Sequence, residues 1–118
     1  MNCFLYNNLV NVFRELGELN MAIKSYENAL AINPNYAEAH FSLSIVLQDF
    51  GQIDLMIEHL QKVVALNPDL AEGHHSLGVG LKELGRLDDA VKSYHKALLL
   101  NPNFFEAHNN LGNAFKEL

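Results

Sequence analysis

Tryptophan is absent from this chain of 118 residues, and cysteine, proline and basic residues are scarce. The single cysteine, Cys3, cannot form a disulfide within the chain, so nothing in the sequence requires an oxidising compartment. No apolar run approaches the roughly 20 residues of a membrane-spanning helix. The first residues also show neither the charged n-region nor the cleavage-like site of a secretory signal. We therefore expect a cytoplasmic protein without a membrane partner.

Positive charge is also scarce. Lysine and arginine number 8 against 14 acidic residues, which gives a formal net charge of −6 at pH 7. Binding to nucleic acid needs clustered Lys and Arg to neutralise phosphate, so we expect no nucleic-acid partner. The most acidic stretch is 37–70, where one base, Lys62, stands against Glu38, Asp49, Asp54, Glu58 and Asp69. A basic partner segment near this stretch and simple solvation of helix faces are the two interpretations.

The few prolines are evenly spaced. Pro34, Pro68 and Pro102 recur at a 34-residue interval, and a glycine stands half an interval before each of them, at Gly17, Gly51 and Gly85. Leucine and histidine keep the same interval, at Leu9, Leu43, Leu77 and Leu111 and at His40, His74 and His108. A fixed period of this kind indicates a repeat architecture. We predict one array over 1–118, with repeats at 3–36, 37–70 and 71–104 and a half-repeat at 105–118.

Each repeat has the pattern of two helices joined by a short turn. In 71–104, a stripe of leucines at helical spacing ends at Gly85, a residue type that favours helix C-termini. A second amphipathic segment follows and ends before Pro102, which has no backbone N–H. The same signals recur in every repeat. The sequence therefore predicts an all-α solenoid of about seven helices, with turns at Gly17, Gly51 and Gly85.

The expected helix starts carry residue types that favour N-caps. Before the first helices, Asn35, Asp69 and Asn103 are each followed three positions later by Glu, as in a capping box. Before the second helices, the corresponding candidates are Asn20, Asp54 and Asp88. We expect these six side chains to cap their helices.

This pattern resembles the tetratricopeptide repeat (TPR), a helix–turn–helix unit with the same period. The third repeat fills the family's positions with His74, Leu77, Gly78, Leu81, Ala90, Tyr94, Ala97 and Pro102. The main departure is His where the family pattern has Trp. The resemblance implies a right-handed α-solenoid. It is closest to the superhelical arrays of O-GlcNAc transferase and related bacterial proteins, through segments such as 106–113.

No catalytic or metal-binding constellation is evident. His40, His74 and His108 are equivalent residues of successive repeats, and helices that pack about 8–10 Å apart hold them too far apart to share one ion. Cys3 has no His or acid implied beside it that could activate a nucleophile. We therefore predict packing or surface roles for these three histidines, solvent-facing positions for His59 and His95, and neither enzymatic activity nor a cofactor or metal.

The resemblance further implies that the first helices line a concave groove. Helical spacing then predicts a peptide-binding stripe made of Asn7, Asn8, Asn11, Phe41, Ser42, Ile45, His75, Ser76, Val79, Asn109, Asn110 and Asn113. Small residues of the same helices are predicted to be points of close helix packing, namely Ala39, Gly73, Gly80, Ala107 and Ala114.

The asparagines of this stripe resemble the ladder by which O-GlcNAc transferase arrays hold a peptide backbone. An amide both donates and accepts hydrogen bonds, so such a row can bind backbone without reading sequence; solvated surface asparagines are the alternative. The stripe does not resemble the Lys/Arg clamp for chaperone C-termini, because only Asn11 matches among Asn7, Asn11, Ser42, Glu72 and Ser76.

We therefore predict a protein–protein interaction module that binds a peptide segment in the groove. The alternative is a structural or self-associating segment of a longer TPR superhelix, such as the non-catalytic part of a protein like O-GlcNAc transferase. Self-association would then use the exposed ends of the array, because no following helix covers Leu111, Phe115 and Leu118.

Overall fold

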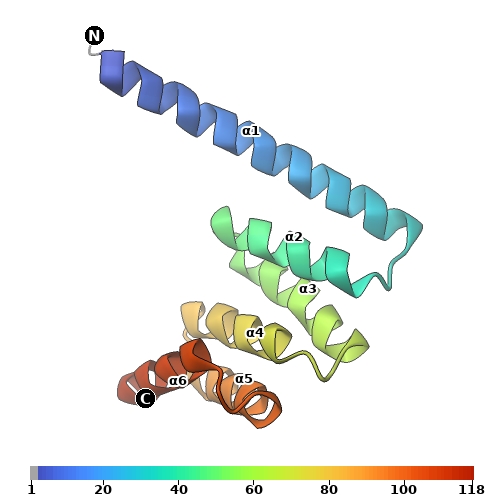
Figure 1. Cartoon of the computed structure of the whole chain (residues 1–118), viewed down its shortest axis with the longest axis vertical. Helices are drawn as coiled ribbons and strands as arrows, with labels where there is room; N and C mark the ends of the chain where they lie inside the picture. Colours follow the sequence, from blue (N-terminus) through green and yellow to red (C-terminus); the bar gives the residue numbers. More distant parts are fainter. Residues whose placement is uncertain (1–2) are drawn as a thin grey trace.

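Six helices joined by short turns make up the computed structural model, which describes residues 3–118, with side chains from Glu15 onward (Figure 1). The helices are α1 (Cys3–Ile32), α2 (Ala37–Asp49), α3 (Ile53–Leu66), α4 (Ala71–Glu83), α5 (Leu87–Leu100) and α6 (Phe105–Glu117). No residue from 3 to 118 lies in a strand. The prediction of an all-α repeat fold is confirmed.

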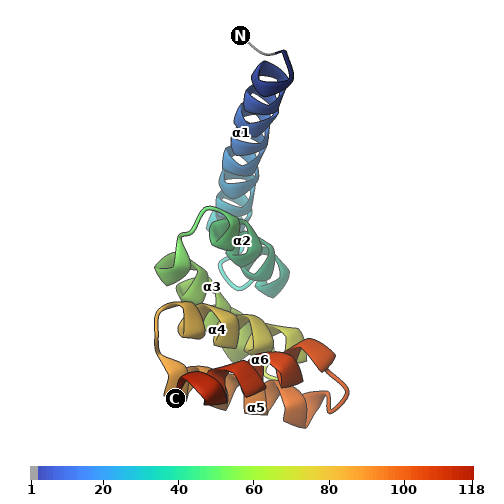
Figure 2. The ribbon, with the colours of Figure 1, turned by 90° about the vertical axis from the view of Figure 1, so that its left-hand side faces the viewer.

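The helices stack in chain order. Each of them packs against the next, and α4 also contacts α6, so that α2, α4 and α6 follow one another along one side of the stack. The radius of gyration of 16.5 Å exceeds the roughly 13–14 Å of a compact chain of this length. Two perpendicular views show α1 extending away from the stack toward the N-terminus (Figures 1 and 2).

The core is spread along the stack instead of having one centre. It contains residues from every helix interface between α2 and α6: Leu43, Leu47, Met56, Ile57, Leu60, Leu77, Leu81, Ala90, Tyr94, Leu111 and Ala114. Most of them recur at the 34-residue interval. Each repeat therefore buries its apolar face against its neighbours, as expected for a solenoid.

Small residues bring neighbouring helices close together. A Cβ atom at Gly80 would lie 3.0 Å from Ile57, and one at Gly73 would lie 3.2 Å from Val63, so these two of the three glycines of α4 face α3. The equivalent residues of the other first helices are also buried, at Ala39, Ala107 and Ala114. The prediction that these five residues are packing points is confirmed.

Two of the predicted glycine turns are present. Gly51 and Gly85 follow α2 and α4 with φ values of 75° and 79°, in the left-handed region that favours glycine. The N–H of Gln52 donates to the carbonyl of Leu47 (2.9 Å), and the N–H of Arg86 donates to that of Leu81 (2.9 Å). These hydrogen bonds close each helix with a Schellman-type turn and reverse the chain into the next helix.

The prediction of a turn at Gly17 is wrong. Gly17 lies inside α1, which continues without a break from Cys3 to Ile32, and its φ is not positive. The described chain therefore has six helices where about seven were expected. Residues 3–16 extend α1 away from the stack instead of folding back against residues 19–32 (Figure 1).

A steric difference between the repeats accounts for this. In the hairpin of α4 and α5, Gly78 faces the ring of Tyr94 so closely that a Cβ atom would lie 2.6 Å from Cε1. Two repeat periods earlier in the chain, Tyr26 takes the place of Tyr94 and Val10 that of Gly78. A hairpin closed at Gly17 would press a branched side chain against the ring, and overpacking of this kind costs about 1–3 kcal/mol.

The predicted N-caps are also wrong. The residues before α2, α4 and α6 are Tyr36, Leu70 and Phe104, and none of the helices from α2 to α6 begins with a side-chain cap hydrogen bond. The candidates at Asn35, Asp69 and Asn103 lie one residue earlier, whereas Asn20, Asp54 and Asp88 lie within helices. At the start of α6, the ring of the N-cap residue Phe104 packs 4.7 Å from that of His75.

Candidate peptide-binding groove

The described residues of the predicted stripe lie on the three helices α2, α4 and α6. Each of them is partly or largely exposed, in three groups of three: Phe41, Ser42, Ile45; His75, Ser76, Val79; and Asn109, Asn110, Asn113. Asn7, Asn8 and Asn11 lie outside the residues whose side chains the structure describes. The stripe therefore presents accessible side chains on three helices that follow one another along the stack.

His75 and Asn110 are brought into direct contact. The Asn110 amide donates from Nδ2 to Nε2 of His75 over 2.9 Å, so the proton of a neutral His75 lies on Nδ1. The His75 ring also lies 4.7 Å from the ring of Phe104 and 5.9 Å from that of Tyr94. Burial lowers the pKa of His75, against the opposing effect of Glu106 and then Glu72. A neutral His75 thus joins α4 to α6.

An ion pair makes a second link between α4 and α6. Nζ of Lys82 lies 3.7 Å from a carboxylate oxygen of Glu117, with both side chains partly exposed. An exposed pair of this kind contributes at most about 1 kcal/mol, so it orients the helices more than it stabilises them.

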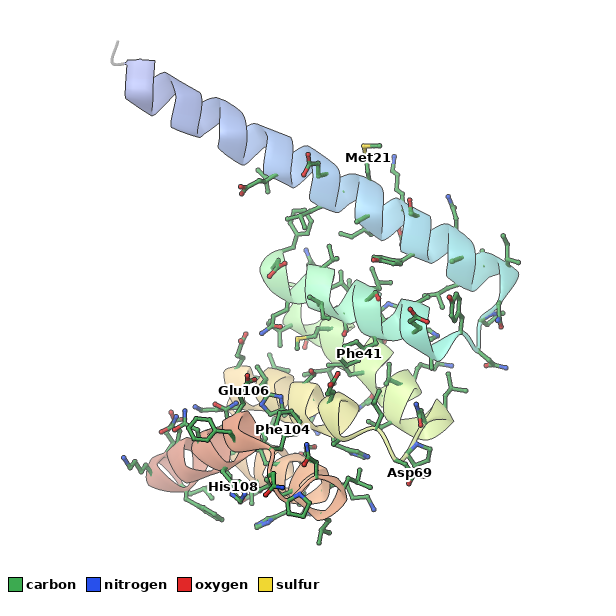
Figure 3. The ribbon with its side chains drawn as sticks, viewed as in Figure 1. Met21, Phe41, Asp69, Phe104, Glu106 and His108 are labelled. Atoms are coloured by element: carbon green, nitrogen blue, oxygen red, sulfur yellow. The ribbon has the colours of Figure 1, made fainter. Side chains whose placement is uncertain are left out.

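Carboxylates outnumber cations on the first turns of these helices. Glu38, Glu72 and Glu106 each lie in the first turn of α2, α4 or α6, where they also interact favourably with the helix dipole. No lysine or arginine lies in those first turns. In Figure 3, Glu106 and His108 lie on opposite sides of α6. The N-terminal ends of α2, α4 and α6 therefore form an acidic margin.

A hollow of about 180 Å³ lies beside Phe41. Side chains from α2, from the start of α4 and from the turn between α3 and α4 line it: Ala37, Glu38, Phe41, Asn67, Leu70 and Glu72. Phe41 lies on the side of α2 toward α4 (Figure 3). The hollow combines an apolar floor with two carboxylates, so its chemistry suits a side chain with an apolar stem and a cationic end.

The repeated histidines form hydrogen bonds to the proline turns. Nε2 of His40, His74 and His108 lies 2.8, 2.9 and 2.8 Å from the carbonyl oxygen of the proline six residues earlier. A carbonyl only accepts, so each Nε2 carries the proton and donates. The predicted packing or surface roles of these histidines are confirmed: His40 is buried, His74 is partly exposed and His108 is exposed. The corresponding signal in the sequence is a His six residues after each Pro.

The prediction that His59 faces solvent is wrong. His59 is half-buried, and its Nδ1 lies 2.9 Å from Nδ1 of His40. His40 donates from Nε2 to Pro34, so its Nδ1 accepts and His59 donates. Burial lowers the pKa of His59, and the nearby His40 lowers it further. His95 is exposed, as predicted. Only the three-dimensional packing of α2 on α3 brings residues 40 and 59 together.

In the structure of residues 3–118, whose side chains are described from Glu15 onward, no group of three or more described His, Cys, Asp or Glu side chains could hold a metal ion. Within the same range, no helix combines the length and the apolar character needed to cross a membrane.

Several solved structures share this fold. MamA is 28% identical with a TM-score of 0.83, and the match covers 88% of this chain and 61% of MamA. The first TPR of Spaghetti (RPAP3), bound to an HSP90 peptide, is 23% identical with a TM-score of 0.82 and covers 91% and 85% of the two chains. The O-GlcNAc transferase of Thermobaculum terrenum is 31% identical with a TM-score of 0.76, covering 83% of this chain and 19% of that enzyme.

This chain thus spans 61% of MamA and a fifth of the transferase. A comparison with curated protein sequences gives no match. Family models do match: one for the TPR repeat over residues 11–51 and 80–118, and one for the tetratricopeptide repeat over residues 37–70. With the 34-residue period and the stacked helical hairpins, these matches show that the chain belongs to the tetratricopeptide-repeat family.

Proposed function

We propose that this chain binds an extended peptide segment across α2, α4 and α6. TPR arrays are protein-interaction scaffolds and are typically non-catalytic, and a chain of this fold, the first TPR of Spaghetti, is bound to a peptide. The observation that carries the proposal is the row of accessible side chains on the alternate helices α2, α4 and α6, with the hollow beside Phe41 next to it.

The polar members of the row fit a peptide backbone. Asn109 and Asn113 are accessible amides on α6, and Ser42 and Ser76 are partly exposed hydroxyls on α2 and α4. Amides and hydroxyls both donate and accept, so they can pair with the N–H and C=O groups of an extended chain.

The acidic margin favours a basic peptide. Glu38 and Glu72 line the hollow beside Phe41, where a lysine or arginine can lay its apolar stem on the ring and its charge near the carboxylates. A peptide that ends in carboxylates, as chaperone C-termini do, would meet repulsion at the same place. The proposed ligand is therefore a segment with alternating apolar and basic residues.

A peptide screen tests this proposal. Short peptides of alternating apolar and basic residues are compared with versions in which Lys and Arg are replaced by Glu. We expect the basic set to bind and its affinity to fall as salt is raised. Phe41→Ala should weaken binding about tenfold, because aromatic anchors in hollows carry much of the energy of an interface. Asn110→Ala and Asn113→Ala should weaken it less.

Lys96→Ala is the matched control. Lys96 is exposed on α5, outside the row, and should leave the affinity unchanged. Unchanged affinity in all three groove variants would exclude the groove as the binding surface. Preferential binding of the acidic peptides would contradict the role given to Glu38 and Glu72.

A second candidate function follows from the likeness to the transferase of Thermobaculum terrenum. The two chains are 31% identical, and the match covers about a fifth of that enzyme. We therefore propose as the alternative that this array is the non-catalytic part of a larger protein of that kind. Sequencing the reading frame around the segment tests it, and a frame without a catalytic domain would rule it out.

A further inference from the structure

The hairpin contact between α4 and α5 pairs a small residue with a large one. Gly78 receives the ring of Tyr94, which is fully buried. In the preceding hairpin, Ser44 and Leu60 hold the equivalent places, and both are buried. A small residue on the first helix thus makes room for a bulky one on the second.

At the end of the stack formed by α1, the bulky residue of this contact lacks a small residue packed against it. Ala22, Tyr26 and Ala29 correspond to Ala90, Tyr94 and Ala97, which are all 0% exposed, yet the three residues of α1 are only half-buried. A hollow of about 340 Å³ lies beside them, between α1 and α2, and is lined by Ser25, Tyr26, Ala29, Tyr36, Glu38, Ala39 and Ser42. It occupies the place where a first helix would pack.

At the other end of the stack, on α6, the small residue of this contact lacks a described bulky residue packed against it. Gly112 corresponds to Gly78, and no described atom lies within 4 Å of a Cβ atom built on it. Phe115, one turn further on, is 52% exposed. The described chain therefore carries an unfilled notch on α6 and an uncovered tyrosine on α1.

The chain's own N-terminal segment is poorly suited to cover Tyr26. Residues 3–16 continue α1 away from the stack, and the residue that would face Tyr26 in a closed hairpin is Val10, not a small one. Gly112 has the size that the contact with a tyrosine requires.

We propose that a second copy of this chain completes the contact. In this arrangement, α6 of one copy packs against residues 19–32 of α1 in the next copy, with Gly112 receiving the ring of Tyr26. The new interface repeats the packing of α4 on α5, so the stack continues across the junction. The two surfaces differ, so the contact is head-to-tail and open-ended.

Charge complementarity supports the same register. Within the chain, Lys82 of α4 pairs with Glu117 of the next first helix, α6, over 3.7 Å. Lys116 of α6 corresponds to Lys82 of α4, one repeat later. In the proposed stack, the next first helix after α6 is α2 of the second copy, in which Asp49 corresponds to Glu117. The junction that joins Gly112 to Tyr26 therefore also brings Lys116 toward Asp49 of the neighbouring copy, with opposite charges.

Sedimentation of the 118-residue chain over a range of concentrations tests the proposal. We expect the average mass to rise with concentration. Gly112→Leu fills the notch and should weaken association at least about tenfold, and Tyr26→Ala should also weaken it because it leaves a cavity. The side chain that Gly112→Leu adds fits the space that Tyr26→Ala leaves, so mixing the two variants should restore association.

Leu99→Ser is the matched control, because Leu99 is 79% exposed on α5 and belongs to neither surface. Its association should equal that of the unchanged chain. A monomer at every concentration would overturn the proposal. Association that survives Gly112→Leu, or that Leu99→Ser abolishes, would show that another surface joins the copies. Circular dichroism of Tyr26→Ala separates loss of the contact from loss of folding.

Discussion

Gly78 and Gly112 are equivalent residues in opposite surroundings. A Cβ atom at Gly78 would lie 2.6 Å from the ring of Tyr94, whereas one at Gly112 would have no described atom within 4 Å. Tyr94 has little room to move, because it is fully buried in the core. The same residue type therefore serves packing at one position and leaves an open notch at the other.

Alanine at these two positions should have opposite effects on stability. Gly78→Ala should lower the free energy of unfolding by about 1–3 kcal/mol through overpacking. Gly112→Ala should raise it by up to about 1 kcal/mol, because alanine favours the helix. Urea unfolding at low protein concentration measures both changes. Equal effects of the two variants would contradict the close approach of Gly78 to Tyr94.

Two histidines make the stability depend on pH. Burial is the main cause that lowers the pKa values of both His59 and His75 below the ordinary 6.5. The folded state therefore binds fewer protons than the unfolded state as the pH falls below 6.5. The contribution of these histidines is complete above that pH and is lost as the pH falls through their lowered pKa values.

The unfolding free energy should accordingly decrease when the pH is lowered from about 7 toward 5. The double variant His59→Gln/His75→Gln should flatten the pH dependence, whereas His95→Gln, at an exposed site, should not. Thermal unfolding at several pH values distinguishes these outcomes, and an unchanged slope in the double variant would contradict this assignment.

At the scale of the helices, glycines with the same spacing have different roles. Gly85 has φ 79° and ends the first helix of its hairpin, whereas Gly17 lies inside the continuous helix α1. Glycine tolerates the left-handed region without strain, but in a helix interior it is less favourable than alanine. The backbone conformation at each glycine thus decides whether substitution by alanine raises or lowers the free energy of unfolding.

We expect Gly17→Ala to stabilise the chain by about 0.5–1 kcal/mol, because it strengthens a helix interior. Gly85→Ala should destabilise it by roughly 1–2 kcal/mol, because alanine must adopt a positive φ. Helix content by circular dichroism and the unfolding midpoint check both. Destabilisation by Gly17→Ala would indicate that the chain turns at residue 17 after all.

Across the whole molecule, burial in the middle of the stack differs from burial at its end. Leu60 of α3 is 0% exposed between helices on both sides, whereas Leu111 of α6 is 9% exposed on the terminal helix. In a linear stack each repeat depends on its nearest neighbours. A defect in α3 therefore affects described helices on both of its sides, whereas a defect in α6 affects described helices on one side only, namely α4 and α5.

Leu60→Ala should lower the unfolding free energy by about 2–5 kcal/mol and should weaken α2 and α4 together. Leu111→Ala should cost less, and hydrogen exchange should show the loss of protection confined to α6 and to the two helices that contact it, α4 and α5. Equal losses spread over all helices in both variants would contradict the linear stack.

The sequence by itself determined the repeat. The 34-residue spacing of Pro34, Pro68 and Pro102, with glycine halfway, predicts the helices from 37 onward and the turns at Gly51 and Gly85. These features are local or periodic: proline and left-handed glycine act on their own backbone, and periodic apolar residues mark the buried face. The accessible stripe on α2, α4 and α6 follows from the same helical spacing.

Only the tertiary structure decided which of these local signals prevail. Gly17 carries the same spacing as Gly51 and Gly85, yet α1 runs through it, and the contact that would close the hairpin sets Val10 against Tyr26. Asn35 and Asp69 match the N-cap pattern, but the helices begin one residue later. His59 reaches His40 only because α2 packs on α3. These outcomes depend on whether residues far apart in the sequence fit against one another. The spacing of residues within one repeat carries no information about that fit.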